Sequence, residues 1–290
     1  MPAFLLTAGA PGLDFQIWET KNSASRANTA NSAILKPAMI SPHSTPAQRL
    51  RRMHDLLFAS YGPQHWWPAQ TPFEVILGAY LTQNTAWKAV ERSLANLRAA
   101  GALTVAGLRR LTLEELRRLI QPSGFSTRKA AALKAFVELL DKEFSGSLDA
   151  LAASPTAALR HRLLALPGVG PETADAMLLY AFGHPVPVAD EYLRRISERH
   201  RLLVPAPGRN RKGYDAMTSL VRQAFALDTP ESQAQLYNEF HALTVAVGKA
   251  HCGKTARCEG CPLAADFAFN SEFQPSTRLK IASTLPNCRV

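Results

Sequence analysis

Hydrophobic residues recur along most of the chain at the three- and four-residue spacing of an α-helix. Three segments show this spacing most clearly: Phe73, Ile76, Leu77, Tyr80 and Leu81; Leu133, Phe136, Val137 and Leu140; and Leu236, Phe240, Leu243 and Val247. Each set would lie on one face of a helix and pack against a core, whereas the alternation typical of strands is scarce. The pattern predicts an all-α fold of about nine to twelve helices.

Several predicted helices begin at recognisable capping sequences. In three of them a hydroxyl residue precedes a proline, which suits the N-cap and first helical positions: Thr45, Ser154 and Thr229. Thr71 with Glu74, and Thr112 with Glu115, have the spacing of a capping box, in which each side chain accepts a hydrogen bond from the other residue's backbone N–H. These residues predict where five helices start.

The segment from Leu166 to Gly170 predicts a tight turn between two helices. Pro167 ends the first helix, while Gly168 and Gly170 permit backbone angles that other residues resist and leave the amides uncovered. Pro171 suits the first position of the next helix. Uncovered amides at a helix start favour an anion such as a DNA phosphate, although an ordinary helical hairpin would have the same sequence.

Four motifs, in order along the chain, resemble the endonuclease III superfamily of DNA glycosylases. They are Leu-Thr-Gln-Asn-Thr-Ala-Trp at 81–87; Pro-Ser-Gly-Phe at 122–125 followed by Arg128-Lys129-Ala130; the hairpin at 166–170 with Asp190 beyond it; and the cysteines Cys252, Cys258 and Cys261. The first motif and the segment 170–175 also resemble the 3-methyladenine DNA glycosylase-like branch. The resemblance spans roughly residues 65–265.

The resemblance implies a two-lobed helical fold with a helix-hairpin-helix (HhH) element and a C-terminal cysteine loop. Residues 45–267 would form the glycosylase domain, with a middle lobe at about 71–187 and a second lobe from 45–70 plus 188–267. The hairpin and Asp190 would then face the cleft between the lobes.

The composition is that of a soluble globular protein, because 47% of the 290 residues are hydrophobic and 19% are charged. No apolar run approaches the ~20 residues of a membrane span. The first residues lack the basic flank of a signal peptide, and we expect a cytoplasmic protein that associates with the nucleoid when on DNA. Residues 1–44 predict a disordered extension or a misassigned start, and residues 268–290 an irregular tail.

The formal net charge of +10 favours a polyanionic partner. Arginines gather at 49–52, 117–118, 194–201 and 209–211. Most of them are expected on solvated faces, and a subset beside the hairpin is expected to contact phosphates. Together with this charge, the resemblance implies a monomer that binds double-stranded DNA carrying a damaged base.

The resemblance assigns catalysis to Asp190. Cleaving a base from a sugar passes through an oxocarbenium-like state, which a nearby carboxylate stabilises. Asp190 also suits a helix N-cap, and one residue can do both. Bifunctional members of the family carry at position 172 a lysine that forms an imine with the sugar and cuts the strand. Glu172 cannot form that imine, so we expect a monofunctional glycosylase in which Glu172 is a favourable first-turn acid.

The resemblance also assigns DNA contacts. Gln83 matches the glutamine that fills the duplex when the target base is extruded, and Asn84 follows it. The hairpin and the helix after it supply further expected contacts: Leu166, Gly168, Val169, Gly170 and Thr173. Three tryptophans are candidates for a base pocket, because aromatic faces stack on bases and attract cations: Trp66, Trp67 and Trp87. Tyr80 is expected in the core.

Three cysteines match most of the family's [4Fe–4S] loop: Cys252, Cys258 and Cys261. Five residues separate the first from the second and two separate the second from the third, but Phe267 stands where the family has its fourth cysteine. Either Cys288 folds back, His251 or another group substitutes, or the cluster is lost or labile. Zinc is a further alternative, and a bound cluster would hold the loop without taking part in the chemistry.

The favoured substrate is an alkylated base, because a 3-alkylated purine is cationic and already a good leaving group. Two other functions stay open. One is a pyrimidine-damage glycosylase with AP lyase activity, which would need another lysine, such as Lys88 or Lys212, to reach the sugar. The other is a non-catalytic module that binds lesions through the hairpin, with Asp190 acting only as a cap.

Overall fold

A computed structural model describes residues 44–266, apart from 65, 67–68 and 227–228. In this part of the chain the structure has no strand and one isolated bridge, between Cys252 and Ala256. Its α-helices are α2 (Pro46–Tyr61), α3 (Pro72–Leu81), α4 (Trp87–Ala99), α5 (Val105–Arg110), α6 (Leu113–Leu119), α7 (Ser126–Phe144), α8 (Leu148–Ala152), α9 (Thr156–Ala165), α10 (Pro171–Ala176), α11 (Glu191–Arg199), α12 (Arg211–Ala224) and α13 (Pro230–Ala250). The predicted all-α fold is confirmed.

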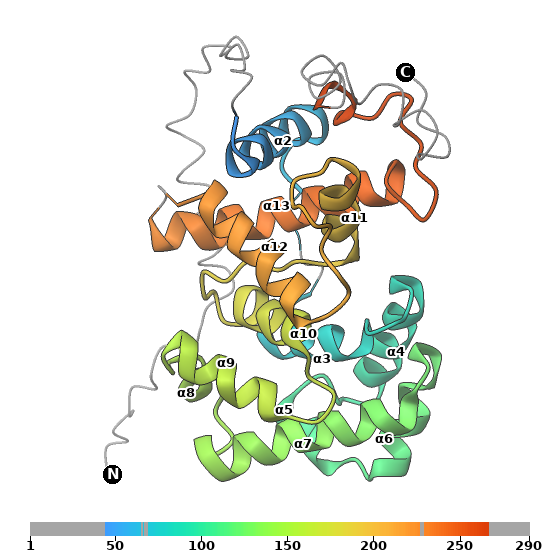
Figure 1. Ribbon diagram of the computed structural model, residues 1–290. Helices are drawn as coiled ribbons and strands as arrows, with labels where there is room; N and C mark the ends of the chain where they lie inside the picture. Colours follow the sequence, from blue (N-terminus) through green and yellow to red (C-terminus); the bar gives the residue numbers. More distant parts are fainter. Residues whose placement is uncertain (1–43, 65, 67–68, 227–228, 267–290) are drawn as a thin grey trace, which may run out of the picture.

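The helices form two groups. Figure 1 shows α2, α11, α12 and α13 together in the upper part of the view, and α3 to α10 in the lower part. The earliest described helix, α2, packs against α12 and α13, which come last in the sequence. A π-helical turn, η2 (Met177–Ala181), continues α10, and the segment 182–190 then carries the chain into the upper group. The upper group is therefore assembled from both ends of the described chain.

Helix α3 lies at the centre of the lower group and packs against η2, α4 and α7. The sequence predicts one buried face for this helix, but every residue from Phe73 to Leu81 is buried. Glu74 is buried with a partner, because its carboxylate pairs with the Arg98 guanidinium at 2.6 Å. The predicted apolar faces of α7 and α13 are buried as expected, with Leu236 only half-buried.

The predicted helix starts are confirmed at Thr45, Thr112 and Thr229, whose side chains cap α2, α6 and α13. The prediction at Ser154 is wrong by one residue: α9 begins at Thr156, and Pro155 occupies the N-cap without a side-chain bond. Proline lacks a side-chain acceptor, so this helix start is uncapped.

Thr71 caps α3 as predicted, but its capping box is incomplete. The Thr71 hydroxyl accepts from the Glu74 N–H at 3.1 Å, whereas the Glu74 carboxylate accepts from the Gln70 N–H at 3.0 Å. The pairing with Arg98 turns the carboxylate away from the Thr71 backbone, so the reciprocal bond shifts by one residue.

The predicted N-terminal extension lies outside the described residues except for Ser44, as does the predicted tail. None of the described helices combines the length and the apolar character needed to cross a membrane.

Candidate active site

The turn between α9 and α10 has the predicted hairpin geometry. Gly168 has φ +76°, a left-handed conformation that favours glycine, and the Val169 N–H donates to the Leu166 carbonyl at 3.2 Å. Gly170 is the extended N-cap residue and Pro171 opens α10. Val169 and Thr173 are buried while both glycines are exposed. The exposed backbone of the turn, rather than the side chains of Val169 and Thr173, is thus available to a ligand.

Gln83 joins this hairpin to the turn after α3. Its Nε2 donates to the Gly168 carbonyl at 2.9 Å and to the Thr173 hydroxyl at 3.1 Å. Asn84, the next residue, is exposed and has φ +51°. The structure therefore brings together two of the predicted DNA-contacting segments, which lie far apart in the sequence.

A buried lysine supports the same surface. The Lys129 ammonium donates to the Leu81 carbonyl at 2.7 Å, to the Thr85 hydroxyl at 2.8 Å and to the Ser123 carbonyl at 2.8 Å. Burial lowers the pKa of Lys129 to about 8, so the ammonium form still predominates at neutral pH. Lys129 thereby fixes the chain on both sides of the Gln83 turn to the segment before α7.

Phe125 is a candidate contact that the sequence reasoning did not assign. It is 62% exposed and adopts φ +48°, and it lines one hollow with Gln83, Asn84, Arg128 and Gly168. A positive φ is uncommon for a large residue other than glycine, so the conformation of Phe125 is a reason to test it as a contact. The Pro-Ser-Gly-Phe motif was its only signal in the sequence.

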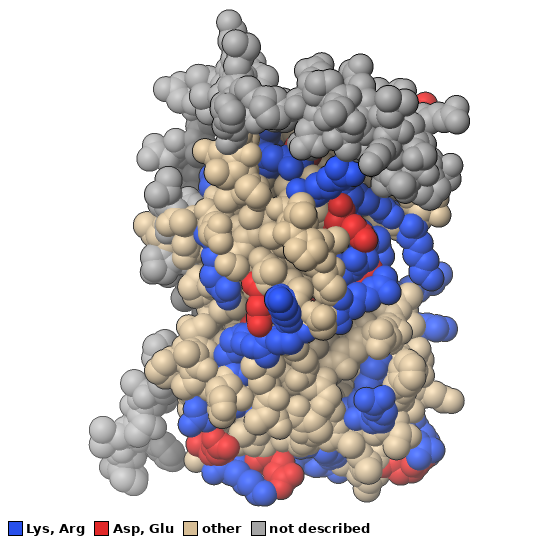
Figure 2. All heavy atoms as spheres, viewed as in Figure 1, with Lys and Arg blue, Asp and Glu red and all other residues tan. Residues whose placement is uncertain are grey.

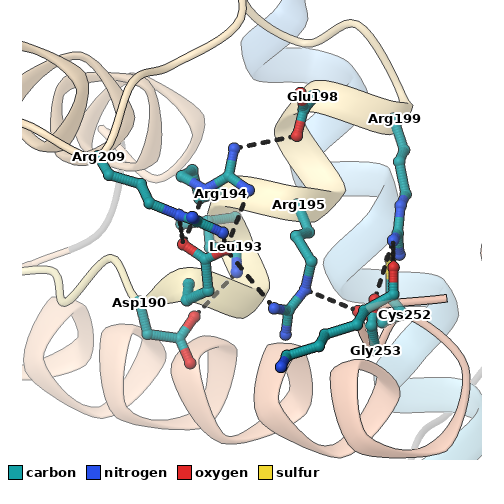
Figure 3. Close-up of polar contacts among 11 residues, drawn as sticks. Asp190, Leu193, Arg194, Arg195, Glu198, Arg199, Arg209, Cys252 and Gly253 are labelled. Atoms are coloured by element: carbon teal, nitrogen blue, oxygen red, sulfur yellow. Dashed lines mark hydrogen bonds and ion pairs between the residues drawn. The ribbon is translucent and has the colours of Figure 1, made fainter. Parts of the chain in front are cut away.

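The two carboxylate oxygens of Asp190 have different partners. It is the N-cap of α11, and its Oδ1 accepts from the Leu193 N–H at 2.8 Å (Figure 3). The residue is 9% exposed. Its Oδ2 lies 3.7 Å from Nε2 of His241, a residue of α13. One carboxylate oxygen therefore holds the helix start, while the other is directed toward the site.

His241, which the sequence did not indicate as a site residue, connects Asp190 to two aromatic residues, Tyr180 and Trp66, which we call the aromatic platform. Its Nδ1 lies 2.6 Å from the Tyr180 hydroxyl, and its ring stacks on Trp66 with centroids 5.5 Å apart. Tyr180 belongs to the π-helical turn η2, a distortion that is frequent at functional sites. A histidine on an apolar helix face gives no local signal of such a role, so the contact became visible only in three dimensions.

The three predicted pocket tryptophans have different outcomes. Trp66 is half-buried and lies beside His241, with the Lys249 ammonium 5.8 Å from its ring centroid. Trp67 lies outside the described residues. Trp87 begins α4 and packs against the hydrophobic core. Tyr80 is buried in the core as expected.

Glu172 stands in the first turn of α10, in the electrostatic field of the same site. Glu172 is exposed, although neighbouring protein atoms partly desolvate its carboxyl group. This desolvation raises the pKa of Glu172 to about 7, and the negative charges of Asp190 and Glu191 add to the rise against the opposing effect of His241. A carboxyl group at this position exchanges its proton near neutral pH.

The arginines of α11 are exceptions to the expectation that most arginines lie on solvated faces. The side chains of Arg194 and Arg195 are 12% and 14% exposed, because Arg194 pairs with Glu191 at 2.7 Å and Arg195 donates to the Cys252 carbonyl at 3.0 Å (Figure 3). Arg199 donates to the Cys252 sulfur at 2.9 Å. Through these contacts, α11 binds the start of the segment 252–261, which contains the three cysteines and is called the cysteine segment below.

The described residues do not assemble a ligand set for an iron–sulfur cluster. Cys252, Cys258 and Cys261 line one small hollow together with His251, but no three His, Cys, Asp or Glu residues of the described chain are grouped to hold a metal. Burial raises the pKa of the Cys261 thiol. Phe267 and Cys288 lie outside the described residues.

Basic side chains are widespread on the surface. On the face in Figure 2, Lys and Arg cover more area than Asp and Glu and extend over both helix groups, in line with the net charge of +10. Such a surface favours a polyanion.

Sequence comparisons place the chain among proteins of DNA repair. Residues 77–213 match the family model described as "HhH-GPD superfamily base excision DNA repair protein". A putative DNA repair glycosylase of Methanocaldococcus jannaschii is 36% identical over 219 residues, which make up 74% of this chain and 94% of that protein. A thymine/uracil-DNA glycosylase of Pyrobaculum aerophilum is 28% identical over 204 residues, or 69% of this chain and 80% of that protein.

Solved structures give the same result. The H. pylori 3-methyladenine DNA glycosylase bound to 1,N6-ethenoadenine is 28% identical and superposes with a TM-score of 0.58, covering 71% of this chain and 98% of that one. Endonuclease III in a non-covalent DNA complex has a TM-score of 0.60 at 21% identity, covering 76% and 94%. At 21% identity, the likeness to endonuclease III shows a shared fold.

Proposed function

Because the chain belongs to the HhH-GPD superfamily of base excision DNA repair proteins, we propose that it is a monofunctional DNA glycosylase, which hydrolyses the N-glycosidic bond of a damaged base and leaves an abasic site. The position of Asp190 carries this proposal. Its Oδ1 caps α11 and its Oδ2 faces His241, so the carboxylate is fixed beside the histidine that stacks on Trp66.

The proposed mechanism divides the work between the two helix groups. Backbone groups of the hairpin, with Gln83 and Asn84, would hold the phosphates and occupy the space that the extruded base leaves. The base would stack on Trp66, and Asp190 would stabilise the positive charge that develops on the sugar and accept a proton from the attacking water. The cysteine segment would support α11 through Arg195 and Arg199.

The absence of lyase activity is proposed on the chemistry of position 172. Glu172 is a carboxylic acid and cannot form an imine with the sugar. Lys88 and Lys212 stand exposed at the starts of α4 and α12 and are the alternatives to test. Borohydride reduction on an abasic duplex would trap any imine, and a covalent adduct would overturn the monofunctional assignment.

An alkylated base is the proposed substrate. Trp66 is an aromatic side chain whose ring stacks on His241, and the carboxylate of Asp190, 3.7 Å from His241, favours a positive charge nearby. The relative from H. pylori, whose name states 3-methyladenine as its substrate, is 28% identical over most of both chains. A cationic alkylated purine leaves readily and needs little further activation.

Incubation with methylated duplex DNA, followed by chromatography of the released bases, tests the proposal. We expect release of 3-methyladenine or 7-methylguanine, and loss of that release in Asp190→Asn with DNA binding retained. Full activity of Asp190→Asn would overturn the catalytic assignment. Binding to abasic DNA without release of any damaged base would favour the non-catalytic module.

A further inference from the structure

Glu172 and Asp190 differ from the other carboxylates around them. Glu191 pairs with Arg194 at 2.7 Å and with Arg209 at 2.8 Å, which lowers its pKa to about 2. In the described part of the chain, neither Glu172 nor Asp190 has an ion pair with lysine or arginine, and His241 lies 3.7 Å from the Asp190 carboxylate. Two carboxyl groups that lack an ion pair with lysine or arginine thus act on each other electrostatically.

Asp175, the other carboxylate of α10, is also neutralised. Arg160 of α9 donates to both of its oxygens, at 2.6 and 3.0 Å, and the Tyr214 hydroxyl of α12 donates to Oδ2 at 2.8 Å. The groups that act on the charge of Glu172 are therefore Asp190 and Glu191 from α11 and His241 from α13, while Glu172 in turn acts on Tyr214. Of the carboxylates here, Glu172 is the one that burial and its neighbours favour in the protonated form.

We propose that Glu172 is a second catalytic residue, a general acid that protonates neutral damaged bases as they leave. The proposal rests on the proposed glycosylase function. Glu172 is placed for this step because it lies in the first turn after the hairpin, exposed to an incoming ligand and in the field of Asp190. The phosphates of bound DNA add negative charge around it and favour its protonated form further.

The step conserves atoms and charge. The carboxyl proton of Glu172 moves to a ring nitrogen of the base, the bond from C1′ to the base breaks, and its electron pair goes to the base, which departs neutral. Water adds to C1′ and gives one proton to the Asp190 carboxylate, and both carboxyl groups then re-equilibrate with solvent. An alkylated purine already carries the positive charge, so its release does not need the proton from Glu172.

The substrate range follows from this division. Cationic lesions would need only Asp190 and the aromatic platform, whereas neutral lesions would also need protonated Glu172. A general acid contributes typically 10²–10⁴-fold to the rate, so removing it should affect the two classes of substrate unequally.

Single-turnover base release from pH 5.5 to 9 tests the inference, with a duplex containing 1,N6-ethenoadenine as the neutral lesion and one containing 7-methylguanine as the cationic lesion. For the neutral lesion we expect a wild-type rate that falls about tenfold per pH unit above pH 7. Glu172→Gln should lower this rate by about 100-fold or more and remove its pH dependence. The same variant should change the cationic-lesion rate by less than about threefold. Glu198→Gln, on the exposed side of α11, is the matched control.

Each other outcome is decisive. An equal loss on both lesions in Glu172→Gln would show that Glu172 does not act as a general acid for neutral lesions in particular, and would overturn the inference. So would wild-type protein that releases 7-methylguanine but no ethenoadenine at any pH, a result that leaves the proposed function intact. If wild-type protein releases neither base, the proposed function fails and this inference fails with it.

Discussion

Asp190 is expected to contribute separately to stability and to catalysis, and two substitutions separate these contributions. Asp190→Ala removes the acceptor for the Leu193 N–H, a bond of 2.8 Å at a position where Leu193 is 1% exposed. Loss of an N-cap costs about 1 kcal/mol, and a buried N–H left without a partner adds to it, so we expect a loss of about 1.5 kcal/mol. For a domain of this size this lowers Tm by about 3–6 °C.

Asp190→Asn keeps the cap, because asparagine is as good an N-cap residue as aspartate. We expect its Tm to lie within about 1 °C of wild type. Both variants lose the carboxylate and should lose base release by about 100-fold or more. Thermal unfolding and single-turnover release of 7-methylguanine measure the two effects on the same preparations.

Two results would refute this reasoning. Equal Tm values for Asp190→Ala and Asp190→Asn, both well below wild type, would show that the carboxylate charge and not the cap stabilises α11. A release rate in Asp190→Asn close to wild type would show that Asp190 is a cap alone.

Three further predictions concern the lower helix group. Glu172→Lys places an amine near the sugar and should create a borohydride-trappable adduct on abasic DNA, and no adduct would mean that position 172 does not reach the sugar. Lys129→Met frees the Gln83 turn and should weaken binding to an abasic duplex about tenfold. Lys134→Met removes another lysine of α7, which donates to the carbonyls of Leu108 and Arg109, and should change binding less than about twofold. Equal losses in the two variants would contradict this expectation. Glu172 binds its proton more tightly in the folded state than in the unfolded state, so the free energy of unfolding of the wild type falls as pH rises from 4.5 to about 7. Glu172→Gln lacks this titration, so its stability relative to the wild type should rise over the same range. The rise should be on the order of 1 kcal/mol, because solvent screens an exposed group. Urea unfolding of both proteins at pH 5 and pH 8 measures this change. The same difference in stability between variant and wild type at both pH values would contradict the prediction.

The sequence predicts those features whose causes are local. The hairpin follows from the glycines and prolines of residues 166–171, and Gly168 adopts the left-handed conformation that this residue type allows. The helical periodicity of α7 and α13 predicts their buried faces because one side of each faces the core. Helix α3 shows the limit: its nine buried residues, Phe73 to Leu81, depend on packing from several sides, and periodicity within one helix does not reveal neighbours on both faces.

The features that the sequence does not predict depend on partners far along the chain. Arg195 has the sequence pattern of a solvated residue, and its burial follows from the Cys252 carbonyl that it binds across 57 positions. His241 lies on the apolar face of α13, and only the fold brings it to Asp190 and Trp66. No spacing rule relates these residues, since long-range contacts are set by how helices pack and not by where they begin.

The candidate site joins the two helix groups, and this explains why its parts carry different chemistry. Gln83, Glu172 and the hairpin come from the lower group, whereas Asp190 begins α11 and His241 belongs to α13 in the upper group. The contact of 2.6 Å between the Tyr180 hydroxyl and His241 crosses from one group to the other beside Asp190. A shift between the groups would change the separation of Glu172 and Asp190, and with it the mutual effect of their charges. The packing between the groups therefore sets the electrostatics of the site.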